Sequence, residues 1–303
     1  MPILDKNQKY ALYQLAKKAA ISAGEFIANY DRSQINISHK PNNSLASQVL
    51  TEVDTLSQEL ILKHLLPSCN EYKLGLLSEE LDEKENTGAG SRFERDFSWC
   101  IDPLDGTLPF TEGRDGYSVS IALVSREGIP QLGVIYNPVS GRLYHSLTGE
   151  GAFINDTPVS TLAWPSTPTP LTWVSDRSFQ SHPNYPLIEE KMAALAHELG
   201  LSWVQKIEHG GAAMNACWVI ENAPACYFKP PKEQRGGGSV WDFAASASLF
   251  NNTFNNTDAW VSDMQGIPLN LNNAETTFMN NDGILYASHE RIAKAILQMT
   301  DLW

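Results

Sequence analysis

The chain has 303 residues, of which 22 are Lys or Arg and 35 are Asp or Glu, so its formal net charge at pH 7 is −13. This acidic balance disfavours nucleic acid as a partner, because duplex binding depends on Lys and Arg side chains that neutralise phosphates. Hydrophobic residues make up 42% and charged residues 19%, which is typical of a chain that folds around a core. An anionic substrate would need local neutralisation, for example by metal ions.

The cysteine pattern and the N-terminus indicate the compartment. The four cysteines lie far apart without Cys-x-x-Cys or Cys/His spacing, which disfavours structural zinc and a disulfide scaffold. We therefore expect reduced, buried thiols. The first ten residues lack an apolar segment after a basic start, and no run approaches about 18 apolar residues. Neither a signal peptide nor a membrane span is indicated, and a cytoplasmic location is expected.

Two helices are predicted near the start of the chain. Apolar residues recur every three or four positions from Asn7 to Tyr30, which predicts one buried face of a long helix. Residues 31–48 interrupt this period. A second helix is expected to begin near Asp54 and to end at Pro67, because proline lacks the amide donor that continues a helix. Both helices should pack on a sheet.

The pattern of strands changes near Thr157. Before it, five short β-rich runs alternate with turn signals, which predicts an antiparallel meander; the runs are SWCID, YSVSIALVS, QLGVIYNP, RLYHSL and GAFIN. After it, strands and helices alternate up to a C-terminal helix that starts at His289, as in an α/β layer. We therefore predict an N-terminal α+β domain over residues 1–157 and a C-terminal α/β domain over residues 158–303.

Acidic clusters lie where predicted strands end or helices begin. The three clusters are Leu77-Ser78-Glu79-Glu80, Trp99 to Thr107 and Val240 to Ala245. Because Pro103 fixes φ and Gly106 permits a tight reversal, Asp102 and Asp105 can converge on one point. Converging carboxylates without Lys or Arg partners repel one another unless a cation lies between them. An all-oxygen ligand set suits magnesium or calcium better than zinc.

Two ions about 3.5–4 Å apart can clamp both the attacking and the leaving oxygen of a phosphoryl transfer. Asp102 is the candidate bridge between them, and Gly106 and Thr107 would add a hydroxyl, amides and a helix N-terminus for an anion. Each piece alone also has a structural interpretation. Asp-Pro-x-Asp-Gly is commonly a surface turn, Thr51 to Asp54 resembles a capping box, and Asp242 can favour a helix dipole. Their joint occurrence favours a metal site.

Taken in order, these segments resemble the signature segments of the inositol monophosphatase family, which includes 3'(2'),5'-bisphosphate nucleotidases and archaeal-type fructose-1,6-bisphosphatases. The segments are Leu50 to Asp54, Leu77 to Glu80, Trp99 to Thr107 and Trp241 to Ala245, and two more, Gly149 to Asn155 and Gly210 to Asn215, are also similar. The resemblance spans nearly the whole chain. It implies a layered α-β-α-β-α sandwich with the metal site between its two domains, and relatives are often homodimers.

The resemblance also implies which oxygens hold two or three magnesium ions. The first ion would be held by Glu79, Asp102, the Leu104 carbonyl and Thr107. The second would be held by Asp102, Asp105 and Asp242, and a weaker third ion would touch Glu79. Glu80 is expected to support this shell from outside.

The implied activity is that of a magnesium-dependent phosphomonoesterase. In the family, a metal-bound water attacks phosphorus in line and is activated by the threonine hydroxyl, whose orientation and basicity depend on an upstream aspartate. Here these residues are Thr107 and Asp54. A hydroxyl is a poor base by itself, so it needs a carboxylate partner and a water of lowered pKa. Inhibition by lithium at the second ion position is a further expectation.

The substrate side departs from the family pattern. Leu108-Pro109-Phe110 follows Asp-Gly-Thr, where many relatives carry Thr-Asn-Phe or Lys-Glu-Phe. Gly211 stands before Ala212 in the sugar-facing segment, where relatives place Ser or Thr. A longer stretch from Phe228 to Gly238 lies where relatives supply a residue that contacts the non-reacting part of the substrate. Its three cations, Lys229, Lys232 and Arg235, could receive a second anionic group, or the stretch is a solvated loop.

Inositol monophosphate and 3'-phosphoadenosine 5'-phosphate are therefore the leading candidate substrates. A fructose-1,6-bisphosphatase-like sugar phosphatase and a non-catalytic metal or phosphate binding module on the same fold are the alternatives. The pair formed by Asp54 and Thr107 argues against a pure binding module, which has no need to activate water. Neither a nucleic acid nor a membrane is expected as a partner.

Overall fold

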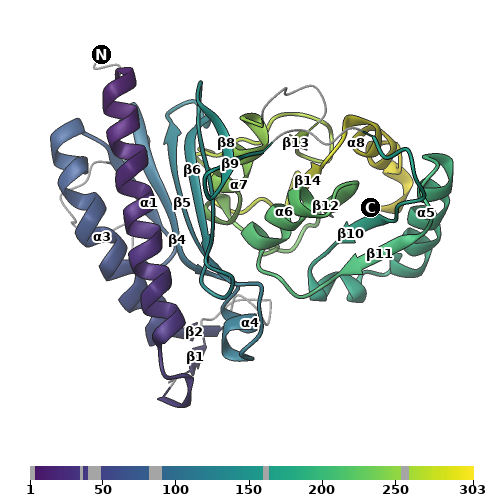
Figure 1. The fold of residues 1–303 in the computed structure, drawn as a ribbon, viewed down its shortest axis with the longest axis horizontal. Helices are drawn as coiled ribbons and strands as arrows, with labels where there is room; N and C mark the ends of the chain where they lie inside the picture. Colours follow the sequence, from purple (N-terminus) through teal and green to yellow (C-terminus); the bar gives the residue numbers. More distant parts are fainter. Residues whose placement is uncertain (1–3, 35–36, 40–48, 82–90, 160–163, 254–258) are drawn as a thin grey trace.

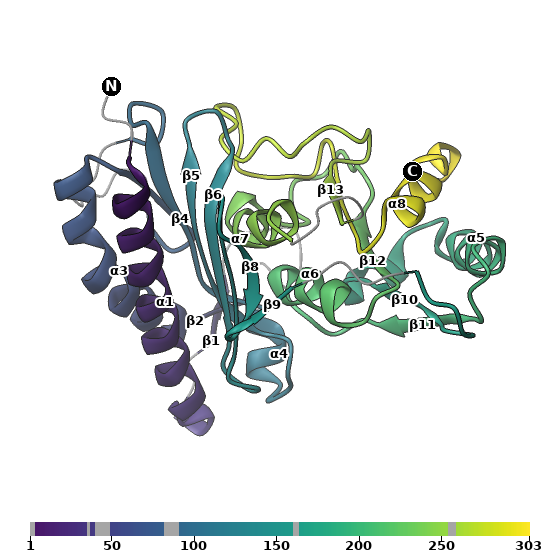
Figure 2. The same ribbon diagram turned by 45° about the horizontal axis from the view of Figure 1, so that its top comes forward.

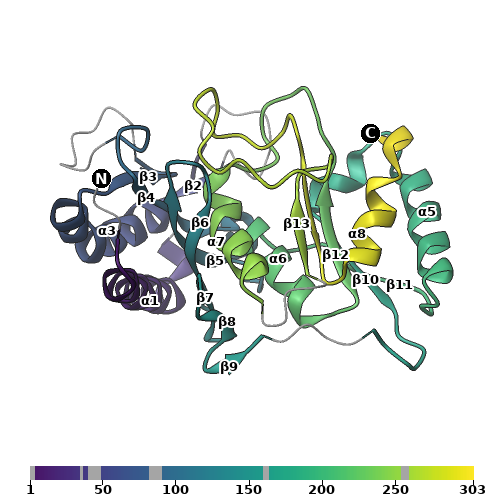
Figure 3. The same cartoon turned by 90° about the horizontal axis from the view of Figure 1, so that it is seen from above.

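The computed structural model describes residues 4–34, 37–39, 49–81, 91–159, 164–253 and 259–303. Helices and sheets alternate in five layers along the long axis of the molecule (Figures 1 and 3). An outer helix pair covers a seven-stranded sheet, a second helix pair separates this sheet from a five-stranded one, and further helices cover the far face. The predicted α-β-α-β-α architecture is confirmed.

The outer pair consists of α1 (Lys6–Asn29) and α3 (Glu52–Tyr72). A capping box starts α1: the Gln8 amide donates to Asp5 Oδ1 (2.8 Å) and the Asp5 amide donates to Gln8 Oε1 (2.9 Å). A buried stripe of small side chains then lets α1 lie close to α3 and the sheet, and it comprises Ala16, Ala19, Ala20 and Ala23. Between the two helices, the short strands β1 (Ile37–His39) and β2 (Val49–Thr51) pair antiparallel after a 3₁₀ turn, η1 (Arg32–Gln34).

The predicted stop at Pro67 was wrong, because α3 continues through this residue to Tyr72. A proline inside a helix removes one hydrogen bond. Burial of Leu65 and Cys69 on either side keeps the last turns against the sheet. The Trp99 indole also donates to Ser68 Oγ (3.0 Å), which ties this end of the helix to the first sheet.

The first sheet contains the predicted meander. Its strands, in spatial order, are β3 (Gly75–Ser78), β4 (Phe97–Asp105), β5 (Ser118–Ser125), β6 (Pro130–Asn137), β7 (Arg142–Leu147), β8 (Gly151–Ile154) and β9 (Thr157–Pro158). All neighbours pair antiparallel except β3 and β4, which are parallel. This edge pairing sets Ser78 beside Ile101, so the residues that follow β3 lie next to the end of β4.

The second sheet has the order β11-β10-β12-β14-β13. Its strands are β10 (Leu171–Val174), β11 (Val204–Ile207), β12 (Ala225–Lys229), β13 (Trp260–Ser262) and β14 (Ile284–Ala287). The first three are parallel to one another and the last two join antiparallel. Its far side carries η2 (Arg177–Ser181), α5 (Tyr185–Glu198), α8 (Glu290–Leu297) and η3 (Thr300–Leu302).

The middle layer consists of α6 (Ala212–Glu221) and α7 (Val240–Asn251), which Figure 2 shows between the two sheets. Helix α7 lies against β5 and β6 at very short range. A β-carbon built on Gly133 of β6 would come within 2.3 Å of the Ala245 carbonyl oxygen, so only glycine allows this approach. The Ser120 hydroxyl donates to the Trp241 carbonyl (3.2 Å), which holds the start of α7 on the sheet.

Cys69, Cys100, Cys217 and Cys226 are buried and free, as expected from their spacing. Among the helices that the structure describes, none combines the length and the apolar character needed to cross a bilayer.

Candidate active site between the sheets

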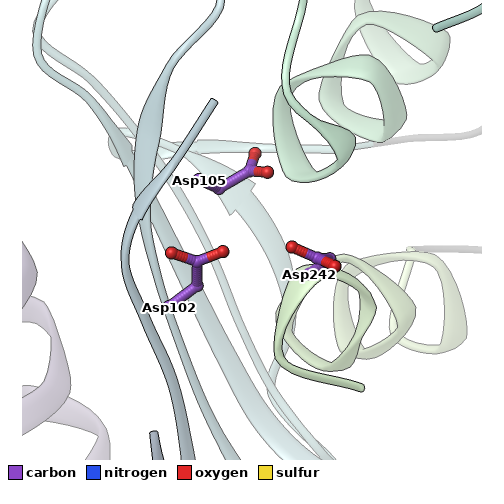
Figure 4. Close-up of side chains that lie close together, drawn as sticks. All are labelled: Asp102, Asp105 and Asp242. Carbon is purple, nitrogen blue, oxygen red and sulfur yellow. The ribbon is translucent and has the colours of Figure 1, made fainter. Parts of the chain in front are cut away.

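Three aspartates meet where the end of β4 faces the starts of α6 and α7. One carboxylate oxygen from each of Asp102, Asp105 and Asp242 lies within 4.8 Å of the other two. Figure 4 shows Asp102 and Asp105 on the same strand, at the end of β4, and Asp242 opposite them on α7. The fold thus places Asp242 beside two residues that lie 137 (242 − 105) and 140 (242 − 102) positions earlier in the sequence.

Asp105 is held at the N-terminus of α6. Its two carboxylate oxygens accept hydrogen bonds from the Ala212 and Ala213 amides, both at 2.9 Å. This approach requires glycine before the helix, because a β-carbon on Gly211 would lie 2.5 Å from Asp105 Oδ2. Gly106, with φ of 86°, provides the left-handed turn that follows Asp105. Sequence analysis missed this contact, although a helix start without a capping side chain at Gly211 was a signal for an external acceptor.

The other two aspartates are fixed by their own segments. Asp102 Oδ1 accepts from the Leu104 amide (3.0 Å) across Pro103. Asp242 accepts from the Ser239 amide within the capping box that starts α7. Asp242 also acts on Asp102 across the crevice and raises its pKa. Carboxylates at this range repel each other unless one of them holds a proton or a cation lies between them.

Burial is the main cause that raises the pKa of all three carboxyl groups. It acts with the charges of Glu79, Asp242 and Asp105 to raise the pKa of Asp102 well above its ordinary value. Burial and the Asp242 charge raise the pKa of Asp105 to about 8, against the two α6 amides and Lys229, which lower it. Burial and the Glu79 charge raise the pKa of Asp242 to about 6. Ionising the whole cluster near neutral pH therefore needs additional positive charge.

Glu79 and Glu80 follow β3 directly. The Glu79 amide donates to the Ile101 carbonyl (3.1 Å), which sets Glu79 beside the strand that carries Asp102. Its side chain is not one of the three that converge within 4.8 Å, but its charge acts on both Asp102 and Asp242. The Glu80 side chain is half-buried next to it. Glu79 thus lies close enough to the cluster to affect its charge state.

A hydroxyl and a fourth aspartate lie at the base of the same turn. Thr107 opens the short helix α4 (Thr107–Thr111), and its Oγ1 donates to Asp54 Oδ1 (3.1 Å), with a longer contact to the Leu104 carbonyl (3.3 Å). Asp54 is buried in the first turn of α3. The Ser57 hydroxyl donates to the Pro103 carbonyl (2.7 Å), which fixes α3 against the turn.

Two of the three cations of the Phe228 to Gly238 stretch, Lys229 and Lys232, lie beside Gly237, and the third is exposed on the loop. Lys229, at the end of β12, forms an ion pair with Asp176 (2.7 Å) and donates to the Gly237 carbonyl (2.7 Å). The Lys232 side chain is exposed, and its amine lies near Gly236 and Gly237. Arg235 is exposed on the loop. Its role as a substrate contact stays a prediction.

The donor set fits a hard divalent cation. The converging groups are carboxylate oxygens, with the Leu104 carbonyl and the Thr107 hydroxyl beside them, and neither histidine nor cysteine belongs to the cluster of three. A bound cation would neutralise the charges whose mutual repulsion raises the pKa of Asp102. The residues present therefore suit magnesium better than zinc.

Comparisons with known proteins agree with this geometry. The model of the inositol monophosphatase family matches residues 8–299. A histidinol-phosphatase from Chlorobaculum parvum is 31% identical over 242 residues, 78% of this chain and 88% of the relative. A protein named Nus factor SuhB from Pasteurella multocida is 27% identical over 297 residues, 94% of each chain.

Solved structures of similar fold cover nearly the whole chain. The extragenic suppressor protein suhB from Bartonella henselae superimposes with a TM-score of 0.70 at 24% identity, over 95% of this chain and 99% of that one. An inositol monophosphatase from Anabaena (Nostoc) sp. PCC 7120 gives a TM-score of 0.64 at 22% identity, over 97% of both chains. At these identities the two structures show a shared fold.

Proposed function

Because the chain belongs to the inositol monophosphatase family, we propose that it is a magnesium-dependent phosphomonoesterase that hydrolyses a small phosphate ester. The observation that carries this proposal is the convergence of Asp102, Asp105 and Asp242 next to the hydrogen-bonded pair of Thr107 and Asp54. The three carboxylates alone would be sufficient for a site that only binds a metal ion. A hydroxyl that is oriented by a buried carboxylate is what proton transfer from water requires.

The proposed ligands of the ions are oxygens of the turn after β4 and of its neighbours. Glu79, Asp102, the Leu104 carbonyl and Thr107 would hold one magnesium ion, Asp102, Asp105 and Asp242 a second, and Glu79 a weaker third, with Glu80 supporting Glu79. When bound, magnesium would neutralise the phosphate charge and lower the pKa of water.

In the proposed reaction, Thr107 Oγ1 takes a proton from the attacking water through a lone pair while its own hydroxyl proton passes along the existing hydrogen bond to Asp54 Oδ1. The hydroxyl is thereby regenerated and Asp54 holds the proton. The water then attacks phosphorus in line with the leaving ester oxygen. Burial of Asp54 keeps its carboxylate from competing water and maintains this orientation.

Backbone amides near the crevice are the proposed phosphate and substrate contacts. Those of Gly106 and Thr107 lie at the start of α4. The Ala212 amide is engaged with Asp105, so it can reach a substrate only when Asp105 releases it. The Asp105 carboxylate fills the space that a side chain at position 211 would occupy, because a β-carbon on Gly211 would lie 2.5 Å from Asp105 Oδ2.

The candidate substrates are inositol monophosphate and 3'-phosphoadenosine 5'-phosphate, and a sugar bisphosphate is the alternative. Relatives named histidinol-phosphatase and inositol-1-monophosphatase widen the set to be tested. The decisive experiment measures inorganic phosphate release from a panel of these esters, with magnesium, with EDTA, and with magnesium plus lithium. Magnesium-dependent release from at least one ester is expected, and lithium should reduce it. A chain that binds magnesium but releases no phosphate from the panel would instead be a binding module.

We also propose that residues 1–157 and 158–303 form the two domains, that the protein acts in the cytoplasm, and that it forms a homodimer. The buried, free thiols suit a reducing compartment. Size-exclusion chromatography with light scattering tests the dimer, and limited proteolysis near residue 157 tests the domain boundary.

A further inference from the structure

A bidentate ion pair connects the end of α4 to the start of η2. The two terminal guanidinium nitrogens of Arg177 donate to the two carboxylate oxygens of Glu112, at 2.7 and 2.8 Å. Glu112 caps α4, the short helix that Thr107 begins, and Arg177 follows β10 of the second sheet. The contact thus joins a segment beside the crevice to the second sheet, and we call it the clamp.

The clamp has the geometry of a strong ion pair. Two parallel N–H···O bonds fix both the separation and the orientation of an arginine and a carboxylate, which a single contact does not. The hydrogen bonds from Arg177 are the main cause that lowers the pKa of Glu112, so the pair is charged at neutral pH. The side chains of Arg177 and Glu112 are 41% and 30% exposed. Loss of one partner would therefore leave the other in contact with water, and such variants should fold.

Helix α4 has little stability of its own. It has five residues, and a helix this short is not maintained by its internal hydrogen bonds. Gly106 (φ 86°) precedes it and Gly113 (φ 69°) follows it, and a β-carbon on Gly113 would meet nothing within 4 Å. The buried Phe110 side chain anchors the middle of the helix. Any rotation about this anchor would displace Glu112 at one end and Thr107 at the other.

The arginine end of the clamp rests on buried hydrogen bonds. Asp176, directly before Arg177, accepts hydrogen bonds from Asn215 of α6 (3.1 Å) and Tyr227 of β12 (2.9 Å), which are both fully buried. Asp176 also pairs with Lys229 (2.7 Å). Because three groups from α6 and β12 hold Asp176, the backbone at Arg177 is a rigid support for the end of α4.

These contacts close a ring around the turn that carries the aspartates. From Asp105 the ring runs through the two α6 amides, through Asn215 to Asp176, and through the clamp back to α4. The Gly211 amide adds a cross-connection, since it donates to the Gly116 carbonyl (2.6 Å). In a closed ring each member is positioned by the others. Breaking the clamp would therefore leave α4 less restrained relative to α6.

We propose that Glu112 and Arg177 are positioning residues, whose ion pair holds α4 so that the Thr107 hydroxyl keeps the orientation that proton transfer requires. This inference rests on the proposed phosphatase activity. A small displacement of a reacting group lowers the rate of the chemical step and has little effect on substrate binding. Both residues act through the clamp, so loss of either one should have the same effect.

Two single variants that change the charge in opposite directions test this equivalence. Glu112→Met and Arg177→Met should each lower kcat for phosphate release about fivefold and change KM less than about twofold, because a misplaced group is lost in the transition state. If Arg177 attracted the phosphate directly, Arg177→Met would raise KM and Glu112→Met would lower it. That opposite pattern would overturn the proposal.

Exchange of the two charges tests the pair itself. The double variant Glu112→Arg with Arg177→Glu restores an ion pair, so its kcat should exceed that of either single charge reversal at least about threefold. Rescue should be partial, because Arg114 also lies beside Glu112 (3.7 Å). The matched control is Arg142→Met, which breaks an ion pair between β7 and the end of α6 and should keep the wild-type kcat. A double variant as slow as the single reversals would contradict the clamp.

Hydrogen exchange tests the clamp without catalysis. The amides of residues 112–114 donate to carbonyls of α4 at 2.9–3.0 Å. In the metal-free protein they should exchange about fivefold faster in Glu112→Met and Arg177→Met than in wild type or Arg142→Met. Ester hydrolysis by wild type, with kcat and exchange unchanged in both single variants, would overturn the clamp alone. Faster exchange in both variants without hydrolysis of any ester by wild type would overturn the phosphatase proposal instead.

Discussion

Two buried polar groups on the first sheet differ in how their charges are satisfied. His145 on β7 contacts Tyr13 through Nδ1 and the Asn155 carbonyl through Nε2 (2.6 Å), and its ring stacks on Phe153. Burial lowers the pKa of His145 to about 4, so the ring is neutral with both nitrogens engaged. The aspartates at the end of β4 instead direct carboxylates toward one another. Both nitrogens of the histidine have partners within the chain, whereas the aspartate cluster would need the proposed cation to balance its charge.

The largest expected effect is on the aspartate side of this comparison. Asp102→Asn and Asp242→Asn remove ligand charge with little change in volume. Each should lower kcat/KM more than about a hundredfold, because a bound metal supplies several kcal/mol of transition-state stabilisation. The measurement is phosphate release at saturating magnesium.

Asp263→Asn is the matched control, since Asp263 is also buried but accepts hydrogen bonds from the Gln265 and Ile267 amides away from the cluster. Full activity is expected there. Full activity of Asp102→Asn would refute the proposed metal ligands, and circular dichroism should show that all three variants remain folded.

The hydroxyl of Thr107 should matter next. Thr107→Val removes the group that bonds to Asp54 and should lower kcat about a hundredfold, in the range of general acid–base effects, with a smaller change in KM. Thr107→Ser should restore most of the rate. Thr111→Val on the same short helix removes a hydroxyl that bonds only to the Leu108 carbonyl, so it serves as the control. Equal rates for Thr107→Val and wild type would contradict the proposed proton acceptor.

The pH dependence of metal-free stability should follow Asp105. Its pKa is about 8 in the folded protein and near 3.8 when unfolded, so between these values the folded state holds a proton that the unfolded chain has released. Stability without metal should therefore fall as pH rises from 7 to 8, a window in which His145 is neutral in the folded protein and mostly neutral in the unfolded chain. Thermal unfolding in EDTA should show Tm decreasing by a few degrees, roughly 2–4 °C for each kcal/mol.

Magnesium should remove this dependence, and Asp105→Asn should reduce its slope in EDTA, leaving the part that comes from Asp102. A Tm in EDTA that is constant or that rises over the same window would show that the cluster is not under electrostatic stress. In that case the charges of the aspartate site, like the nitrogens of the histidine site, would be satisfied by groups within the chain.

The smallest effect is expected at the histidine site. Tyr13→Phe leaves the His145 nitrogen without its buried partner and should reduce the free energy of unfolding by about 1–3 kcal/mol. Urea titration measures this loss. Both kcat and the magnesium concentration for half-maximal rate should stay at wild-type values, since Tyr13 lies on α1, outside the crevice. A changed magnesium requirement would show that the two sites are coupled.

Much of the site was accessible from the sequence because it is built from local turns. Asp102-Pro103-Leu104-Asp105-Gly106-Thr107 forms one continuous segment, and its geometry follows from Pro103 and Gly106. The meander was likewise predicted from alternating strands and turns. Long-range contacts were not: the parallel pairing of β3 with β4 brings Glu79 beside Asp102, and no local pattern specifies that register.

The cations of the Phe228 to Gly238 stretch show the same limit. Lys229 was recognised as a cation, but its partner Asp176 lies 53 positions earlier, counted as 229 − 176, on the connection after β10. Lys232 and Arg235 are near neighbours in the sequence, yet the Lys232 amine lies beside Gly237 whereas Arg235 is exposed on the loop. Where each cation of a glycine-rich stretch lies depends on backbone turns, and composition does not determine these.

The contact between Gly133 and Ala245 limits how this protein can be stabilised. Glycine in a central strand weakens the strand, so replacing it with a β-forming residue is a common way to stabilise a sheet. Here a single added methyl group would move α7 outward, and with it the Asp242 carboxylate, away from partners that belong to β4. Selection for heat resistance should therefore spare this position and act on loops and helix surfaces, which can change without altering the width of the crevice.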